Sequence, residues 1–396
     1  MSPRSSFLII NFAALALIAG GFLYLVNRPS EVSFQQTAPA TNSPAQTAAV
    51  DASLATPLEI PSPDPSPPTD AAPKKVQPTS TVIATIKTVP VQKPAAQQEP
   101  DNRVLRIQNP YPFAPVPFEA IDTIARPSLV NILCAPLRAG SFSPISGSGV
   151  IIDQRGVILT NAHVAQYVLL AQSLRVNLTC AIRTGAPATP RWSSEILYIP
   201  PVWVEEHAHE VAMAKPAGTG EHDYALLRIT GSLDGVPLPT AFPYLPVDTR
   251  EAIGFQGDQV LAVSYPAEFL ASAAQFNTYP ASSVTTIGRL ITFGTKTIDV
   301  ISLGGIVGAQ GGSSGGAVVN AWGQLIGLLS TTSEGETTAD RDLRAITLSY
   351  LSRDLAAQTR FDLPTILGGD IVAQALDFNT QIAPRLIDIY LAEIEK

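Results

Sequence analysis

Three short segments carry residues that together could activate a hydroxyl group. Ser314 lies within a glycine-rich string, His163 follows an apolar run, and Asp223 precedes one. A serine hydroxyl is a weak nucleophile near neutral pH, because it needs a base to take its proton and an acid to orient that base. The three residue types therefore predict nucleophilic catalysis, with Ser314, His163 and Asp223 as the catalytic residues.

The segments that must position these residues read as short strands. From Leu129 onward, apolar and β-branched runs alternate with glycine and proline, and few stretches have helical spacing. This pattern predicts an all-β fold of the sandwich or barrel type. Two barrels that share one cleft are expected, since residues 101–355 exceed what one small barrel needs. The expected strands are Leu129–Cys134, Gly149–Asp153, Gly156–Thr160, Val176–Ile182, Tyr224–Ile229, Gln259–Ser264, Val284–Ile291, Ile298–Ser302, Gly316–Val319 and Gln324–Ser330.

The last part of the chain has a different pattern. From Leu343 the apolar residues recur at three- and four-residue spacings, and a second such run extends from Pro384 to Lys396. We expect residues 356–396 to form a tail of short helices. Such a tail would pack either against the core or against another subunit.

A membrane anchor is expected at the amino terminus. After a short flank at residues 1–6, Phe7–Val26 holds twenty residues of which only Asn11 is strongly polar, a length that can span a bilayer. A cleaved signal peptide is the alternative, although its apolar region is normally shorter. Arg4 and Arg28 flank the span and barely distinguish its two orientations. We expect the chain beyond the span to lie on the extracytoplasmic side, while a cytoplasmic location remains the alternative.

The next stretch, residues 27–100, reads as a spacer. It is rich in proline, alanine, threonine, serine and glutamine, and it holds 14 of the 35 prolines of the chain. Such a composition buries too little apolar surface to offset the entropy of ordering, so a disordered linker is expected.

Charge and composition exclude several other classes of protein. The formal net charge of −8 gives no basic surface of the kind that nucleic-acid binding requires. With four histidines and two cysteines, no metal site and no cofactor are expected. His207 and His209 lie among glutamates, which favours a solvated acidic loop over a metal site. The expected partners are a protein or peptide substrate and a membrane.

The motifs resemble one known family. Ser146-Gly147-Ser148-Gly149-Val150-Ile151-Ile152 is followed by Gly156-Val157-Ile158-Leu159-Thr160-Asn161-Ala162-His163-Val164, then by the Asp223 segment and Gly312-Ser313-Ser314-Gly315-Gly316-Ala317-Val318-Val319-Asn320. In this order they resemble the trypsin-like serine peptidases of the HtrA/DegP group, over roughly Ser128 to Leu355. The resemblance implies a chymotrypsin-like pair of six-stranded β-barrels, with His163 and Asp223 in the first and Ser314 in the second.

The same resemblance assigns the remaining site residues. The backbone N–H groups of Gly312 and Ser314 would form the oxyanion hole. Gly308 would form the base of the primary substrate pocket, and its wall would come from Leu328, Leu329 and Ser330. Because no carboxylate lies at that base, an apolar residue such as Val, Ala or Leu is expected before the cleaved bond, rather than Lys or Arg.

The chain also departs from related enzymes. Ser313 stands where digestive enzymes carry the aspartate that pairs with a freshly cut amino terminus, so activation by cleavage is not expected. The residues after Leu355 are too few for the PDZ domain that most of the HtrA group carries. The stretch Arg183–Gly220 is longer than usual and reads as an insertion or as a segment that shapes access of the substrate.

Two further features stay open at the level of sequence. Cys134 and Cys180 fall on expected strands of the first barrel, and they form either a disulfide, which suits an extracytoplasmic protein, or two separate buried thiols. HtrA-like enzymes are commonly homotrimers joined through aromatic residues ahead of the first barrel. Tyr111, Phe113 and Phe118 stand in such a place, but they are equally suited to cap their own core.

The main functional hypothesis is a membrane-anchored serine endopeptidase that cleaves exported or misfolded proteins. The alternative is a protein-binding module that keeps the same fold without catalysis. All three catalytic residue types are present, which favours the enzyme.

Overall fold

The structure is a computed structural model that describes residues 106–107, 109–137, 143–211, 220–251, 253–268, 277–294, 296–332, 337 and 339–396. The predicted membrane span at 7–26 and the predicted linker at 27–100 lie outside these residues. None of the helices in the described ranges is both long and apolar enough to cross a membrane.

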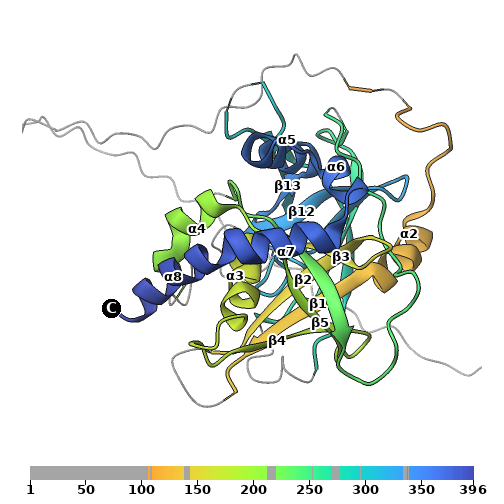
Figure 1. The fold of residues 1–396 in the computed structure, drawn as a ribbon. Coiled ribbons are helices and arrows are strands. Elements are labelled where there is room, and N and C mark those ends of the chain that lie inside the picture. Colours follow the sequence, from red (N-terminus) through yellow and green to blue (C-terminus); the bar gives the residue numbers. More distant parts are fainter. Residues whose placement is uncertain are drawn as a thin grey trace, which may run out of the picture. The chain divides into compact units, whose positions relative to one another are not determined.

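The first sheet is a closed barrel of six antiparallel strands (Figure 1). Three of its strands are longer than expected and two are shorter, while the strand at Thr189–Tyr198 was not expected. In barrel order the strands are β1 (Leu129–Ala135), β2 (Ile145–Asp153), β3 (Val157–Thr160), β6 (Ala225–Ser232), β5 (Thr189–Tyr198) and β4 (Thr179–Thr184).

The hairpin between β2 and β3 has a tight turn. Gly156 adopts a positive φ of 83°, and its N–H donates to the carbonyl oxygen of Asp153 over 2.9 Å. Glycine takes this conformation without steric cost. The turn sets the direction of β3, which leads directly to His163.

The second sheet has seven strands, where the resemblance implied a six-stranded barrel. The expected strand Val284–Ile291 is in fact two strands, and Leu343–Thr347 is a further strand that was not expected, so the five expected strands become seven. Neighbouring strands are again antiparallel. Their order is β8 (Ala281–Thr286), β7 (Gln259–Ser264), β11 (Ala317–Asn320), β12 (Leu325–Thr332), β13 (Leu343–Thr347), β10 (Val300–Gly304) and β9 (Arg289–Ile291).

Short helices connect and cover the sheets. Ahead of β1 lie α2 (Phe118–Ala125) and the 3-10 helix η1 (Arg126–Ser128), and α3 (Ala162–Ala171) follows β3. The expected insertion at Arg183–Gly220 contains β5, α4 (Pro201–His207) and the 3-10 helix η2 (Ala208–Glu210). His207 and His209 are therefore on helices, and not on the loop that the sequence suggested.

The carboxyl-terminal helices pack against the first barrel. Asn379 Nδ2 donates to the carbonyl oxygen of Ile196 in β5 over 2.7 Å, and the Phe378 ring meets that of Tyr198. Tyr390 is buried in the same hydrophobic core as the barrel strands, and Figure 1 shows the last two helices running across the region of α3 and α4. These helices are α5 (Leu348–Thr359), α6 (Leu363–Gly368), α7 (Ile371–Gln381) and α8 (Ala383–Ile394).

Two boundaries predicted from the sequence are wrong. The helical pattern does not begin at Leu343, because Leu343–Thr347 is strand β13 and helix α5 begins at Leu348, where Thr347 Oγ1 caps it by accepting from the N–H of Tyr350. The domain boundary placed after Leu355 falls inside α5.

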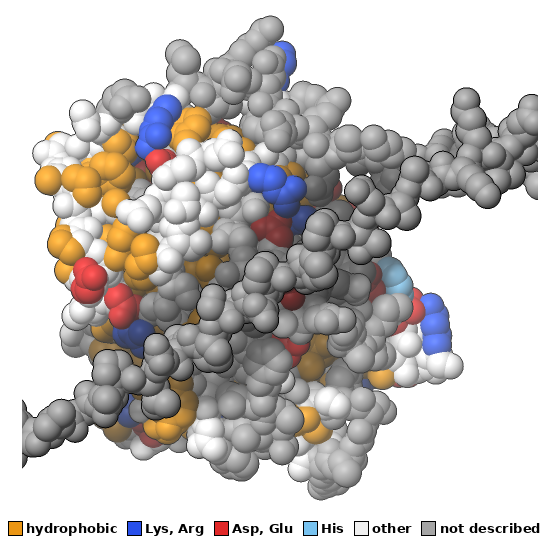
Figure 2. Space-filling model, turned by 180° about the vertical axis from the view of Figure 1, so that it is seen from behind, with side chains coloured by type: hydrophobic (Ala, Val, Ile, Leu, Met, Phe, Trp, Pro, Cys, Tyr) orange, Lys and Arg blue, Asp and Glu red, His pale blue; other side chains and the backbone are white. Residues whose placement is uncertain are grey.

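The face opposite that of Figure 1 carries mixed side chains. Figure 2 shows that the described Lys and Arg side chains on it stand apart from one another, with hydrophobic side chains distributed among polar ones. The described residues on this face therefore form no continuous basic surface.

Candidate active site

The loop that carries Ser314 connects β10 to β11 and depends on two glycines. Gly312 has a φ of 90° and occupies the third position of a turn that is closed by a 3.2 Å hydrogen bond from Ser313 N–H to Gln310 O. A positive φ at this position is the mark of a type II turn. At Gly315, with a φ of 87°, an added Cβ would lie 2.0 Å from Ser148 O. Glycine is therefore required at both positions, because of the positive φ at Gly312 and Gly315 and because a side chain at Gly315 would clash with Ser148 O.

Two N–H groups of this loop have no partner within the described part of the chain. Gly312 N–H and Ser314 N–H make no hydrogen bond, whereas the N–H groups of Ser313, Gly315 and Gly316 all donate to carbonyl oxygens. These two are the groups expected to form the oxyanion hole. Their free donors are what stabilisation of an oxyanion requires.

His163 and Asp223 are brought together by α3 and by the turn before β6. His163 is the second residue of α3, its side chain is half-buried, and its Nδ1 lies 2.8 Å from Asp223 Oδ2. The backbone N–H of His163 donates to Asp223 Oδ1 over 3.0 Å. One carboxylate thus fixes both the ring and the backbone of the histidine.

Two further residues orient Asp223. Ser330 Oγ donates to Asp223 Oδ2 over 2.8 Å, and Asn161 Nδ2 donates to the Asp223 carbonyl oxygen over 2.8 Å. Neither role was predicted, because a serine at the end of an apolar run and an asparagine before a helix have no distinctive spacing. The Asp223 carboxylate thus contacts three donors, which are the His163 backbone N–H, the His163 ring and the Ser330 hydroxyl, and these contacts favour its ionised form.

The pKa values of the pair move apart. Burial alone would raise the pKa of Asp223, but the charge of His163 and the hydrogen bonds outweigh burial and lower it. Burial alone would lower the pKa of His163, but the Asp223 carboxylate and its hydrogen bond raise it. The arrangement therefore favours a charged imidazole beside a charged carboxylate, which is the state a general base reaches after it takes a proton.

Ser314 is linked to the His163–Asp223 pair through Ser330, and it makes no direct hydrogen bond to His163 among the described residues. Its Oγ donates to the carbonyl oxygen of Ser330 over 3.2 Å, and it makes no hydrogen bond to His163 in the described part of the chain. Ser330 thus contacts both Ser314 and Asp223. For Ser314 to pass its proton to His163, the hydroxyl would have to leave Ser330 O and donate to His163 Nε2.

Ser148 links the barrel to the Ser314 loop. Its backbone N–H donates to Ser314 O over 2.7 Å, and its Oγ donates to Gly312 O over 2.7 Å. The same Oγ accepts from the N–H of Tyr265 over 2.8 Å, and the side chain is fully buried. Ser148 lies in the glycine-serine motif of β2, but its role depends on contacts that spacing does not reveal.

The residue before Asp223 is held in an unusual conformation. His222 has a φ of 57°, its backbone N–H donates to Tyr350 Oη over 3.1 Å, and its Nδ1 lies 2.9 Å from Asp354 Oδ2. Both partners belong to α5. The hydrogen bond to Asp354 raises the pKa of His222. Helix α5 therefore holds the turn from which Asp223 projects.

The predicted substrate pocket needs a correction. Leu328 and Leu329 both have 0% of their surface exposed, so they belong to the core and cannot contact a substrate. Ser330 is 8% exposed, and its hydroxyl is engaged by Asp223. Of these three residues of β12, only Ser330 forms hydrogen bonds with the catalytic residues, through its hydroxyl to Asp223 and its carbonyl oxygen to Ser314.

Gly308 has surroundings that suit the predicted apolar pocket base. A Cβ placed on it would lie 3.5 Å from Leu343 Cδ2, 3.6 Å from Ser264 Oγ and 3.9 Å from Ile306 Cδ1. None of these neighbours carries a charge.

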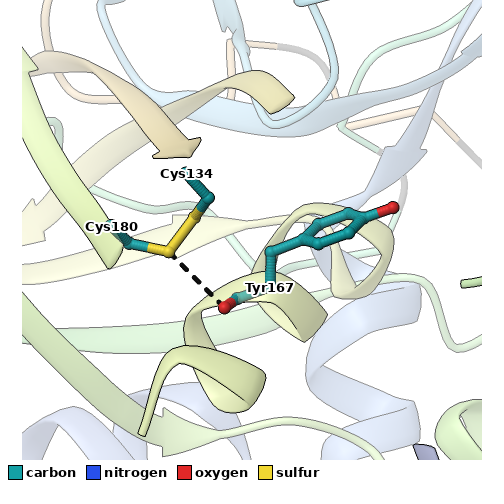
Figure 3. The surroundings of a disulfide bond; sticks show 3 residues. All are labelled: Cys134, Tyr167 and Cys180. Carbon is teal, nitrogen blue, oxygen red and sulfur yellow. Dashed lines mark hydrogen bonds between the residues drawn. A yellow bond between two sulfur atoms is a disulfide. The ribbon is translucent and has the colours of Figure 1, made fainter. Parts of the chain in front are cut away.

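A disulfide lies beneath the helix that carries His163. Cys134 on β1 and Cys180 on β4 face each other in register, and they are bonded (Figure 3). Cys180 Sγ lies 3.4 Å from the carbonyl oxygen of Tyr167 in α3. The bond therefore ties the first and last strands of the barrel order together directly under α3.

Comparison with known proteins agrees with this geometry. Residues 147–328 match the family model described as a trypsin-like peptidase domain. The chain is also similar to serine protease HTRA4 of Mus musculus, with 27% identity over 246 residues that cover 61% of this chain and 41% of the relative. The chain thus matches less than half of that relative's length. These matches confirm the resemblance inferred from the motifs.

Proposed function

We propose a function from the premise that this chain contains a trypsin-like peptidase domain similar to that of HtrA-type serine proteases. The protein acts as a serine endopeptidase, in which Ser314 is the nucleophile, His163 the base and Asp223 the orienting acid. The observation that carries the proposal is the His163–Asp223 pair beside a glycine loop with two free N–H donors.

The proposed reaction has two halves. Ser314 Oγ attacks the carbonyl carbon of the peptide bond while its proton passes to His163 Nε2. The carbonyl oxygen becomes an oxyanion that accepts hydrogen bonds from the N–H groups of Gly312 and Ser314. The carbon–nitrogen bond then breaks as His163 returns the proton to the leaving amine. A water molecule, activated by His163, hydrolyses the resulting ester and restores Ser314.

The proposed substrates are exported or misfolded proteins, cleaved after a small or medium apolar residue such as Val, Ala or Leu. The uncharged surroundings of Gly308 support this preference, because a Lys or Arg side chain would be buried there without a carboxylate. A digest of a peptide library would test it, and cleavage confined to Lys and Arg would contradict it.

We further propose that Phe7–Val26 anchors the protein, with the peptidase domain on the extracytoplasmic side. The Cys134–Cys180 disulfide supports this location, since such bonds persist in oxidising compartments. Reporter fusions after residue 100 would test the topology, and activity of a cytoplasmic reporter would overturn it.

A homotrimer is the proposed assembly. Tyr111 packs against Phe113 and Trp322 of its own chain, but the Phe113 side chain is about half exposed, which leaves apolar surface for a partner. Light scattering on the purified protein would show a trimer, and a monomer at micromolar concentration would contradict it.

The decisive test of the enzyme is labelling with a fluorophosphonate probe. Wild type should label under native conditions, and Ser314→Ala should not, because the probe bonds to the activated Oγ. Ser313→Ala is the matched control: its hydroxyl is buried against Ser264 Oγ at 3.0 Å, and this variant should label. Failure of folded wild type to label would favour the alternative of a non-catalytic binding module.

A further inference from the structure

The loop that carries the oxyanion donors is held without the ion pair used by digestive enzymes. Ser313 stands in place of the pairing aspartate, and its side chain is buried and engaged by the hydroxyl of Ser264. Some other group must therefore fix the turn at Gly312. This inference rests on the proposed function, since it concerns the same oxyanion hole.

Gly311, the residue before Gly312, is held by hydrogen bonds to both its carbonyl oxygen and its N–H group. Gly311 O accepts from the N–H groups of Ala267 and Glu268 over 2.8 and 3.0 Å, and Gly311 N–H donates to Glu268 Oε2 over 2.9 Å. Gly311 O and Gly312 N–H belong to one planar trans peptide, so they point in opposite directions. Fixing Gly311 O toward Ala267 and Glu268 therefore directs the Gly312 N–H away from them.

The Glu268 carboxylate is itself fixed by an arginine from the segment that precedes β13. Arg341, two residues before β13, donates from Nη1 to Glu268 Oε2 over 2.6 Å and from Nη2 to Glu268 Oε1 over 3.0 Å. Arg341 Nη1 also donates to Ala309 O over 3.0 Å. The ion pair thus contacts the loop at Ala309 and at Gly311, just before the turn.

We propose that Glu268 and Arg341 are positioning residues that hold the oxyanion donor at Gly312 in its productive orientation. A rotation of the Gly311–Gly312 peptide would turn Gly311 O away from two N–H groups. The Glu268–Arg341 pair opposes this rotation, because it keeps Glu268 in place beside Gly311. It takes the role that a cut amino terminus has in digestive enzymes.

The pair is placed so that its removal should not unfold the protein. The Glu268 and Arg341 side chains are 36% and 15% exposed, so the pair lies near the surface. Such a pair contributes little to global stability. Its loss should therefore affect the reaction more than the fold.

The test compares Glu268→Ala, Arg341→Ala and the double variant with wild type. Removing one oxyanion donor typically costs about 10²–10³ in kcat, and partial misplacement should lower kcat about 10- to 100-fold with a smaller change in KM. The double variant should be no worse than the poorer single variant, because both changes release the same turn. Glu268→Gln should restore part of the activity, since its amide oxygen can accept from Gly311 N–H.

The matched control lies in the first barrel. Arg228 pairs with Glu195 at a similar exposure, and Arg228→Ala removes an ion pair that does not touch the Ser314 loop. This variant should keep the fluorophosphonate labelling rate and kcat/KM within about twofold of wild type.

A readout that does not depend on activity separates this inference from the proposed function. Amide hydrogen exchange of residues 308–314 should be faster in Glu268→Ala than in wild type, with unchanged melting temperature. If wild type does not label, the proposed function fails while the exchange still tests the positioning pair. If wild type labels, and Glu268→Ala and Arg341→Ala match it in kcat, labelling rate and exchange, the inference is overturned.

Discussion

At the scale of single residues, the chemistry depends on how many hydrogen-bond donors contact the Asp223 carboxylate. Asp223 accepts from His163 through both ring and backbone, and from Ser330. These donors favour the ionised carboxylate, which in turn selects the His163 tautomer with a proton on Nδ1. In the proposed reaction, the lone pair on Nε2 is then free to take the proton of Ser314.

The raised pKa of His163 predicts a specific pH dependence. The base must be neutral, so kcat/KM should rise with pH through a value above about 6.5. Asp223→Asn removes the cause of the shift, so the rise should move to lower pH while kcat falls about 10⁴-fold. Rates measured from pH 5 to 9 on both proteins test this, and a profile that Asp223→Asn leaves in place would refute it.

The same shift acts on stability in the opposite sense. Because the folded pKa of His163 lies above its ordinary value, the protonated pair stabilises the fold below that value. This contribution is lost as the pH rises through the folded pKa. The active, neutral form is therefore the one that receives less stabilisation from the pair.

Residue roles could be predicted from the sequence only where the chemistry requires several particular residues in consecutive positions. The strings around Ser314 and His163 are distinctive because glycine and strand residues must surround the reacting groups. Ser148 and Ser330 are single serines on strands, and their partners lie far away in sequence. Leu328 and Leu329 were misjudged as pocket residues, since the sequence gives no direction for a side chain in a strand buried on both faces.

At the scale of elements, the first barrel is braced where α3 rests on it. The Cys134–Cys180 bond links residues 46 apart in sequence, and it lies against Tyr167 of α3. Replacing both cysteines by serine should lower the free energy of unfolding by about 2–4 kcal/mol, chiefly by freeing the unfolded chain. A lower urea midpoint in the variant and in reduced wild type would support this. Equal midpoints for oxidised wild type and variant would count against it.

Strands and helices were predictable from the sequence where a single pattern of apolar residues runs without interruption. Gln259–Ser264 has the expected bounds because its continuous apolar run, Val260–Val263, is bounded by a polar residue at each end. Strand β5 was missed, since Pro190, Arg191 and Glu195 interrupt its apolar pattern. At β13 the apolar residues continue into α5, so the spacing of the helix was assigned to the strand before it.

At the scale of the whole molecule, the chain returns from the second sheet to cover the first barrel. Helix α7 places Phe378 against β5 with 4% of its surface exposed, whereas Leu376 on the same helix is 68% exposed. Phe378→Ala should cost about 3–5 kcal/mol of stability. Leu376→Ala should change stability by less than about 0.5 kcal/mol. Melting curves of the two variants would test the docking, and equal effects would contradict it.

The docking of α8 has a consequence for biosynthesis. Its buried residues Leu386 and Tyr390 belong to the same core as α3, the helix on which His163 stands. During synthesis, His163, Asp223 and Ser314 all emerge before the residues that complete this core. We therefore expect the nascent chain to gain activity only after α8 has emerged, which would spare the machinery that makes it from premature cleavage.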